Sequence, residues 1–535
     1  MSSSNSRVPE GIEAMPRVLE LFEFYGPAYT WFAVVTAMLA SFATLLTATV
    51  INVAIPEIMG AFGIGQDEAQ WLSTAFLASG SVTMLLMAWC VDAFGMRQTY
   101  VWSVLVFLFG SILGGFAHNP ETLILARIIQ GASAGVLGPI AMTLNYQIFP
   151  VARRGFAMGI FGIGVVLAPA LGPTVGGFLI DNYDWRYVFF LAIPFSLISI
   201  PLAMMFMPVR EEAGPRPSFD WTGAILSSIF LVSLLTGLSD GQREGWQSDY
   251  IVLLFATAVI SATLFVWWEN RIEKPMLDLE LFTNPGFVAA SLVTLVIGVG
   301  LYGSTYLLPL FVQGLQGITP TASGLLMLPA GLVMAAMFPV AGMLSDSFQP
   351  RFVIIAGLLL FGLSNWFMRV VDLETPFMRL LVWAIVGRIG LALLFPGLNA
   401  AALSSLPLHL LSQGSGAINF LRQLGGAFGV NMLSIFLARR TAQFSDQLAT
   451  TQAPSPDTLV VLKHLNEMLA VQGYAFMEQL ILSMGYLSRT VYGQASALAF
   501  REGFYLVAIV FFLAIIPTWF MKVDRCQSPD PDWRA

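Results

Sequence analysis

The chain has 535 residues, of which 57% are hydrophobic and 11% are charged, and its formal net charge at pH 7 is −7. Soluble domains carry about 25% charged residues, so this chain cannot cover its surface with polar groups and its solvent must be largely lipid. The diffuse negative charge gives no reason to expect a nucleic-acid partner. Lysine is nearly absent and no Gly-x-x-x-x-Gly-Lys-Ser/Thr loop occurs, which argues against a pump with its own ATP site.

No catalytic or metal-ligating group of residues is recognisable in the sequence. The histidines His118, His409 and His464 are scattered in predicted loops, and Cys90 and Cys526 are far apart. An enzyme needs a nucleophile beside a base, or a set of metal ligands. We therefore expect no enzymatic activity, no cofactor and no metal site.

Fourteen apolar runs are long enough to cross a bilayer core about 30 Å thick, which needs around 20 helical residues. They are 30–55, 69–91, 99–117, 122–148, 156–180, 186–207, 219–238, 250–268, 287–312, 321–344, 352–370, 377–404, 413–437 and 502–522. Six spans precede residue 210, six follow residue 286, and two lie between. The sequence therefore predicts an all-α membrane protein with two six-helix halves and two additional central transmembrane helices.

These runs divide the chain into five segments. They are an N-terminal segment 1–29 with an expected amphipathic helix at 10–28, a six-helix half 30–210, two additional helices with connectors 211–285, a second half 286–522, and a tail 523–535. The second half includes the long segment 438–501, whose apolar stretches predict a partly helical hairpin; a disordered loop is the alternative.

Arginine and lysine indicate the orientation. The loops on the side of the N-terminus carry most of these residues, whereas the short loops of the other side carry only Arg186, Arg243, Arg369 and Arg379. Short cytoplasmic loops are enriched in Lys and Arg. With an even number of spans, we expect both termini in the cytoplasm and 438–501 outside.

Two loops at corresponding places in the halves carry a similar charged pattern. One follows the second span, at 88–97 (AWCVDAFGMR), and the other follows the second span of the later half, from residue 342. An aspartate at one helix end can cap a neighbouring helix and form a breakable latch. A solvated loop is the alternative. The candidates for a cytoplasmic gate are Asp92, Gly95, Arg97, Asp346 and Arg351.

Predicted span 122–148 contains an arginine in the pattern Arg-Ile-Ile-Gln-Gly, with Arg127 and Gln130. A charge inside a span is expensive unless it faces a partner or water, so Arg127 is a candidate functional residue. The alternative is a structural arginine bonded to backbone carbonyl groups.

Predicted span 156–180 is rich in glycine and proline between Gly159 and Gly177. Small residues let helices approach closely, and prolines free backbone groups and bend a helix. This pattern is typical of a hinge that also seals. Its residues are Gly164, Pro169, Gly172, Pro173, Gly176 and Gly177.

The motifs resemble those of the major facilitator superfamily, specifically its fourteen-span drug:proton antiporters of the EmrB/QacA type. The family patterns are Gly-x-Leu-x-Asp-Arg-x-Gly-Arg-Arg after span two, Arg-x-x-Gln-Gly in span four and Gly-x-x-x-Ala-Pro-x-x-Gly-Pro-x-x-Gly-Gly in span five. Segments 237–246, 269–282 and 414–429 also resemble the family. The resemblance implies a major facilitator fold and drug export by alternating access across the inner membrane. It also implies a proton as coupling ion and a periplasmic adaptor protein docked on the 438–501 hairpin.

The first span departs from the family pattern Leu-Asp-x-Thr-Ile-Val-Asn-Val-Ala-Leu-Pro, because Thr47 stands where the family has a buried aspartate. A threonine hydroxyl cannot take up and release a proton near neutral pH. No Asp or Glu lies in the interior of any predicted span, so the ionisable residues left in span interiors are Arg127, Arg388 and Arg422. We therefore expect neutral or anionic substrates, and coupling through a peripheral acid such as Glu57 or no proton coupling.

The sequence thus predicts a secondary transporter that exports hydrophobic or amphiphilic small molecules and is surrounded by membrane lipids. A dedicated exporter of one metabolite, siderophore or lipid is the alternative. The amide side chains of Asn145, Asn399, Asn419 and Gln423 are candidates to line the transport cavity. Hydrogen bonds between helices are the alternative role for these side chains. The candidate substrate or coupling residues are Thr47, Asn52, Arg127, Gln130, Arg388, Asn399, Asn419 and Arg422.

Overall fold

The computed structural model describes residues 16–210, 218–273, 275–452 and 456–521, so the predicted tail 523–535 and most of the N-terminal segment lie outside the described residues. The described residues form helices and no strands. The helices are α1 (Pro16–Tyr25), α2 (Tyr29–Phe62), α3 (Gln66–Phe94), α4 (Met96–Gly115), α5 (Pro120–Ile148), α6 (Arg154–Asn182), α7 (Tyr187–Phe190), α8 (Ile193–Phe206), α9 (Trp221–Glu244), α10 (Asp249–Glu269), α11 (Pro285–Gly314), α12 (Pro320–Ser347), α13 (Pro350–Met368), α14 (Phe377–Ser404), α15 (Leu411–Gln452), α16 (Pro456–Val471), α17 (Phe476–Leu513) and α18 (Ile515–Trp519).

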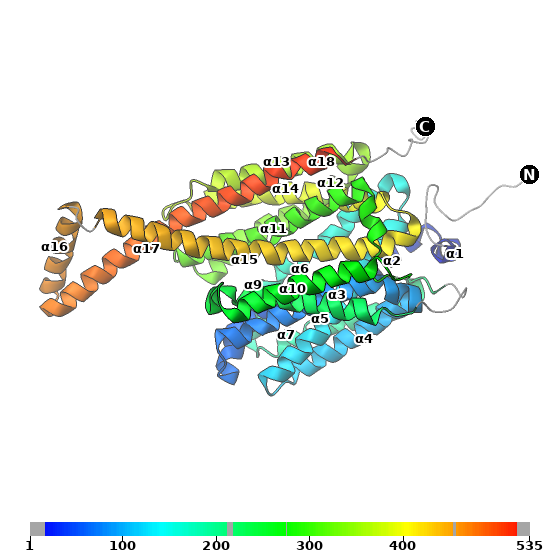
Figure 1. Ribbon diagram of the computed structural model, residues 1–535, viewed down its shortest axis with the longest axis horizontal. Coiled ribbons are helices and arrows are strands. Elements are labelled where there is room, and N and C mark those ends of the chain that lie inside the picture. Colours follow the sequence, from blue (N-terminus) through cyan, green and yellow to red (C-terminus); the bar gives the residue numbers. More distant parts are fainter. Residues whose placement is uncertain (1–15, 211–217, 274, 453–455, 522–535) are drawn as a thin grey trace, which may run out of the picture.

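Fourteen helical segments of the described chain are long and apolar enough to cross a membrane. Helices α2 to α8 form one half, helices α11 to α18 form the other, and α9 and α10 are the two additional spans. The predicted fold class is therefore confirmed. In Figure 1 helices α1 and α18 lie toward one end of the bundle, here called the terminal end, and α16 projects at the opposite, hairpin end.

The two additional helices lie along the seam between the halves, which α3 and α15 form. An apolar cluster joins Leu234 and Leu238 of α9 and Ala258 of α10 to Leu424 and Phe428 of α15. On the other side, the ring of Phe219 packs against the Trp89 ring of α3, with the centroids 4.5 Å apart. The pair α9–α10 therefore contacts both halves.

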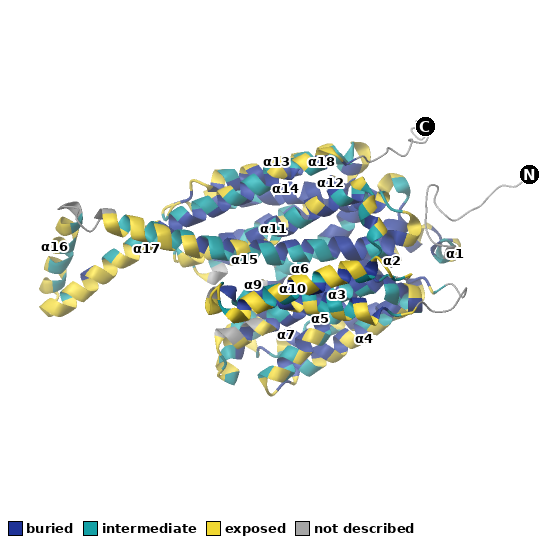
Figure 2. Ribbon diagram, in the orientation of Figure 1, coloured by how far each residue is buried: buried dark blue, intermediate teal, exposed yellow. Residues whose placement is uncertain are grey.

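The described part of segment 438–501 is helical except for the turn at 472–475, and its helices are longer than the predicted boundaries suggested. Helix α15 has 42 residues and α17 has 38, so both continue past the predicted span ends into the hairpin. At 1.5 Å per residue, α15 is about 60 Å long, twice the thickness of a bilayer core. Figure 2 shows that the hairpin is mostly exposed, while the bundle interior is buried. The apolar runs indicate only the part of each helix that lies in the membrane, and both helices continue beyond it.

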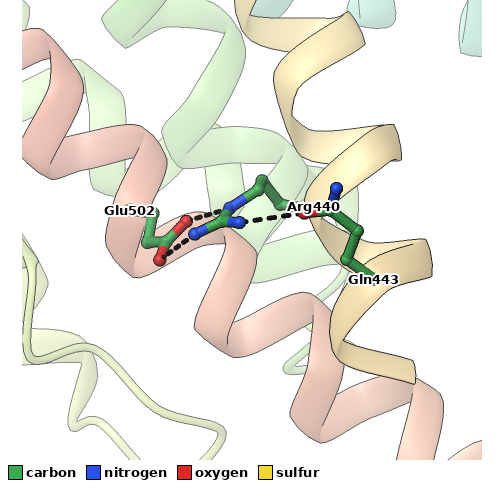
Figure 3. Close-up of polar contacts among 3 residues, drawn as sticks. All are labelled: Arg440, Gln443 and Glu502. Atoms are coloured by element: carbon green, nitrogen blue, oxygen red, sulfur yellow. Dashed lines mark hydrogen bonds and ion pairs between the residues drawn. The ribbon is translucent and has the colours of Figure 1, made fainter. Parts of the chain in front are cut away.

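An ion pair joins the two long helices at the root of the hairpin. Arg440 of α15 contacts both carboxylate oxygens of Glu502 on α17, and its Nη2 lies 2.6 Å from Oε1. Arg440 Nη1 also donates to Gln443 Oε1 at 2.9 Å (Figure 3). A bidentate guanidinium–carboxylate pair fixes direction as well as distance, so it holds α15 and α17 in register. The predicted boundaries had placed Arg440 in a loop.

Glu502→Gln should loosen the root of the hairpin, because a neutral amide keeps one acceptor but loses the charged, two-point contact. We expect faster amide hydrogen exchange around residues 438–445 and 498–505, measured by mass spectrometry. Glu467→Gln is the matched control, since Glu467 is an exposed hairpin acid whose contact with His464 is 3.9 Å long. Equal exchange in Glu502→Gln and the wild type would show that the pair does not hold the hairpin.

Candidate transport site and gate

The halves meet most closely where the first turns of α6 cross the last turns of α12. A Cβ atom built on Gly159 would lie 2.5 Å from the backbone oxygen of Phe338, and one built on Gly162 would lie 2.7 Å from the Phe338 ring. A Cβ on Gly342 would lie 2.5 Å from the backbone oxygen of Gly155. These distances leave no room for a side chain, so glycine lets the two backbones touch.

Asp346 of α12 caps α6 across this contact. Its Oδ1 accepts from the backbone N–H of Gly155 at 2.7 Å, and its Oδ2 accepts from that of Phe156 at 2.9 Å. The first N–H groups of a helix have no intrahelical partner and carry partial positive charge, so a carboxylate there is stabilising. A residue of one half thus completes a helix of the other, at the terminal end.

The other candidate gate residues do not join Asp346. Arg97 donates from Nε to the backbone oxygen of Met207 at 2.8 Å, within its own half. Gly95 adopts φ +85°, and a Cβ there would lie 2.7 Å from the Arg210 backbone nitrogen, so this turn requires glycine. Asp92 is exposed and faces Arg210.

Arg351 also stays within its own half. Its guanidinium lies 4.8 Å from the centroid of the Phe352 ring, and its Nε has no partner among the described residues. Of the five gate candidates, Asp346 is the one that contacts the other half of the protein.

Helix α15 makes further contacts with the other half. Ser415 Oγ donates to the backbone oxygen of Pro139 on α5 at 2.9 Å. Gln423 Nε2 donates to the backbone oxygen of Leu77 at 2.8 Å and to Ser81 Oγ at 2.9 Å, both on α3. A Cβ on Gly416 would lie 2.5 Å from the Met84 backbone oxygen. Helix α15 therefore provides a second set of contacts between the halves, in addition to the α6–α12 contact.

The later residues of the proline–glycine segment pack on α2 of the same half. A Cβ on Gly172 would lie 2.3 Å from Thr49 Oγ1, and one on Gly176 would lie 2.7 Å from a Val50 methyl group. A Cβ on Gly164 would lie 2.2 Å from the terminal methyl group of Met38 on α2. A Cβ on Gly177 would meet no described atom within 4 Å.

Helix α6 continues through the two prolines of this segment. Pro169 is half-buried, and the side chain of Pro173 lies outside the described residues. The segment therefore faces the other half with its first turns and its own half with its last ones.

Arg127 is fully buried in α5. Its Nε donates to the backbone oxygen of Leu72 at 2.8 Å, its Nη1 donates to Gln130 Oε1 at 3.0 Å, and its guanidinium lies 4.3 Å from the Phe76 ring centroid. Gln130 in turn donates to Ser111 Oγ at 3.0 Å. This conformation thus shows Arg127 bonded to a backbone carbonyl group, which was the alternative that the sequence left open. Its Nη2 has no partner in the part of the chain that the structure describes.

The second half contains two more buried arginines. Arg388 of α14 is 8% exposed, and no hydrogen bond or ion pair forms to it within the described ranges. Eleven positions later, Asn399 has an unpartnered Nδ2. Arg422 of α15 contacts Asn419 Oδ1, and its guanidinium lies 4.7 Å from the Phe395 ring centroid of α14. Residues 388, 395 and 399 share one face of α14, because they are spaced by seven and four positions.

The remaining candidates divide between buried and exposed positions. Thr47 is buried, and its hydroxyl donates to the backbone oxygen of Ala43 on its own helix at 2.9 Å. Asn52 is exposed and accepts from Ser73 Oγ at 3.0 Å. Asn145 donates to Met38 Sδ at 3.5 Å, and Asn419 Nδ2 donates across the halves to Met142 Sδ at 3.2 Å. In this conformation Thr47 is a helix-bonded core residue.

The sequence reasoning missed two buried carboxyl groups. Asp220, before α9, is 6% exposed, and Glu269, the last residue of α10, is 3% exposed. Both fell in predicted connectors or at their edges, where acids are ordinarily solvated. Asp220 and Glu269 are 49 positions apart in the sequence, and the fold brings them together beside the connector that follows α10.

The fold and this arrangement define a polytopic transporter of two helical halves that meet at a closed end. The chain belongs to the major facilitator superfamily, whose family model matches residues 37–430. It is 33% identical over 426 residues to an uncharacterized MFS-type transporter YhcA of Bacillus subtilis, covering 79% of this chain and 80% of that one.

It is also 28% identical over 490 residues to the multidrug export protein EmrB of Haemophilus influenzae, covering 90% of this chain and 94% of that protein. The human organic anion transporter MFSD10 has a similar fold, with a TM-score of 0.59 at 13% identity, covering 92% of this chain and 99% of that one. The EmrB/QacA-type resemblance is therefore confirmed, and the chain is a transporter rather than an enzyme.

Gly159→Ala should weaken closure of the terminal end, because the new methyl group would overlap the backbone of Phe338. We expect faster hydrogen exchange of the Gly155 and Phe156 amides, which Asp346 caps. Gly177→Ala is the matched control on the same helix, since it meets nothing within 4 Å. The same exchange rates in both variants would contradict a closure set by the α6–α12 contact.

Proposed function

We propose that the protein exports hydrophobic or amphiphilic small molecules, neutral or anionic, across the inner membrane by alternating access. The observation that carries the proposal is the set of three buried arginines, Arg127, Arg388 and Arg422, none of which pairs with a carboxylate of the described residues. The similarity to EmrB of Haemophilus influenzae, a multidrug export protein, supports export.

A buried guanidinium without a counter-charge is destabilising by several kcal/mol unless a partner or water reaches it. Arg388 shows this condition most clearly, since it is buried and makes no polar contact within the described chain. An anionic group of a substrate would supply the missing partner. A lipophilic cation would instead add a like charge, so cations are poor substrates in this account.

The distribution of Lys and Arg supports an orientation with both termini in the cytoplasm. The closed terminal end then faces the cytoplasm, and the hairpin lies outside. In this proposal the α6–α12 contact and Asp346 form the cytoplasmic gate, which must separate when substrate enters from inside.

The proton remains the proposed coupling ion, but no acid occupies position 47. The peripheral candidate Glu57 is exposed and lies in the last two turns of α2, which ends at Phe62. A coupling site would therefore lie away from the position that the family uses.

The exposed hairpin supports a second part of the proposal, a periplasmic adaptor protein as partner. Its apolar side chains are exposed to an extent that is unusual for solvent-facing helices. They include Val471 at 89%, Phe476 at 73%, Val460 at 66% and Ile481 at 66%.

Transport by the reconstituted protein tests the charge preference. We expect saturable transport of a sulfonated amphiphilic dye and none of a quaternary ammonium dye. Arg388→Gln should lower kcat/KM for the sulfonated dye about tenfold or more, because a hydrogen bond to a charged group contributes about 1.5–3 kcal/mol.

Arg369→Gln is the matched control, since Arg369 is an exposed arginine that stacks 4.3 Å from the Trp366 ring centroid. It should transport as the wild type does. Saturable transport of the quaternary ammonium dye, unaffected by Arg388→Gln, would contradict the proposal.

A further inference from the structure

Two carboxyl groups meet at the terminal end of the additional helix pair. Asp220 is the N-cap of α9: its Oδ1 accepts from the backbone N–H of Gly223 and from Trp268 Nε1, each at 2.9 Å. Glu269 ends α10, and its Oε2 accepts from the backbone N–H of Leu277 at 3.3 Å. Each acid therefore uses one oxygen to hold the local backbone.

The other two oxygens, Asp220 Oδ2 and Glu269 Oε1, are buried and accept from no donor of the described residues. They lie side by side over Gly223, where a built Cβ would be 2.1 Å from Oδ2 and 2.6 Å from Oε1. Both oxygens lie within 2.6 Å of that one position, so the two carboxyl groups are in close contact. Two ionised carboxylates offer only acceptors, so such a contact needs a proton.

No counter-charge replaces that proton among the described residues packed around the pair. On α3, Asp92 faces Arg210. In the connector, Arg271 stacks 4.2 Å from the Trp267 ring centroid, and the carboxylate of Asp278 accepts from the backbone N–H of Glu280.

Near this end of the bundle, the other described charged or titratable groups are Cys90 on α3, the exposed connector acids Glu273 and Glu280, and His409 before α15; Lys274 of the connector lies outside the described residues. None of them forms an ion pair with Asp220 or Glu269 in the described chain. Like charges that share a buried site cannot both ionise readily, and one of them keeps its proton.

We propose that Asp220 and Glu269 form a proton-binding site in which the two carboxyl groups share one proton. The site lies on the additional helix pair, because Asp220 precedes α9 and Glu269 ends α10. The shared proton would donate across the gap between Oδ2 and Oε1. Because both oxygens face the same gap, the proton belongs to the pair and not to either residue alone.

The protonated pair also fixes a connector that touches both halves. Met276 is buried in a cluster with Leu85 of α3, and Phe420 of α15 packs against the same cluster. The backbone N–H of Asp278 donates to Gln413 Oε1, in the first turn of α15, at 2.9 Å. Glu269 holds Leu277 between these two contacts. Loss of the proton would place two negative charges under the connector and loosen it from the seam.

The test is the pH dependence of thermal unfolding of the purified protein, together with its infrared spectrum. The folded pair keeps a proton that both acids lose in the unfolded chain, so stability falls as pH rises until the pair itself ionises. We expect the wild-type Tm to fall from mildly acidic to mildly alkaline pH. A protonated-carboxyl band should be present at neutral pH and disappear over that range.

Glu269→Gln should remove most of this fall in Tm and the carboxyl band, because the amide donates to Asp220 Oδ2 without a titrating proton. Glu273→Gln, at an exposed acid of the same connector, is the matched control and should keep both. Asp220→Asn provides a second variant if Glu269→Gln does not fold, since asparagine is also a good N-cap. An unchanged pH dependence in the variants overturns the proposal. Stabilisation by sodium at fixed pH in place of the pH response also overturns it, because a metal cation would then occupy the gap.

Discussion

The fold depends on one close approach, where the backbones of α6 and α12 touch through glycines. Gly155, Gly159 and Gly342 leave no space for a Cβ atom, and Asp346 then reaches the free N–H groups at the start of α6. Packing alone would tolerate several relative positions of the halves. The carboxylate cap fixes one of them, because it needs both N–H groups within hydrogen-bonding distance. Since neither contact is covalent or deeply interlocked, the same surfaces can separate.

The rest of the architecture follows from that closure. Helix α15 joins the halves on the opposite side of the bundle, and α9 and α10 cover this seam against lipid. The enclosed arginines gain no carboxylate from the described protein, so an anionic group is most favourable where Arg388 lies. Three acids that shape the described fold instead lie at helix ends, namely Asp346, Asp220 and Glu269.

The sequence was sufficient for the span count and the division into halves, because both depend on apolar length alone. It placed Asp346 at a helix end, but it could not show that Asp92, in a similar loop, stays within its own half. The apolar pattern placed one span end just before Arg440 and one span start at Glu502. The helices α15 and α17 continue beyond these points into the hairpin. Above all, the sequence could not pair Asp220 with Glu269 or bond the hydroxyl of Thr47 to its own helix, since these contacts depend on how helices turn toward one another.

Pulsed electron paramagnetic resonance between spin labels at Ala152 and Phe348 measures the closure most directly. Both positions are exposed, and they flank the α6–α12 contact. In lipid nanodiscs we predict a short and a long distance population, with Gly159→Ala moving protein from the short to the long one. A single short distance that Gly159→Ala leaves unchanged would contradict a gate made by this contact.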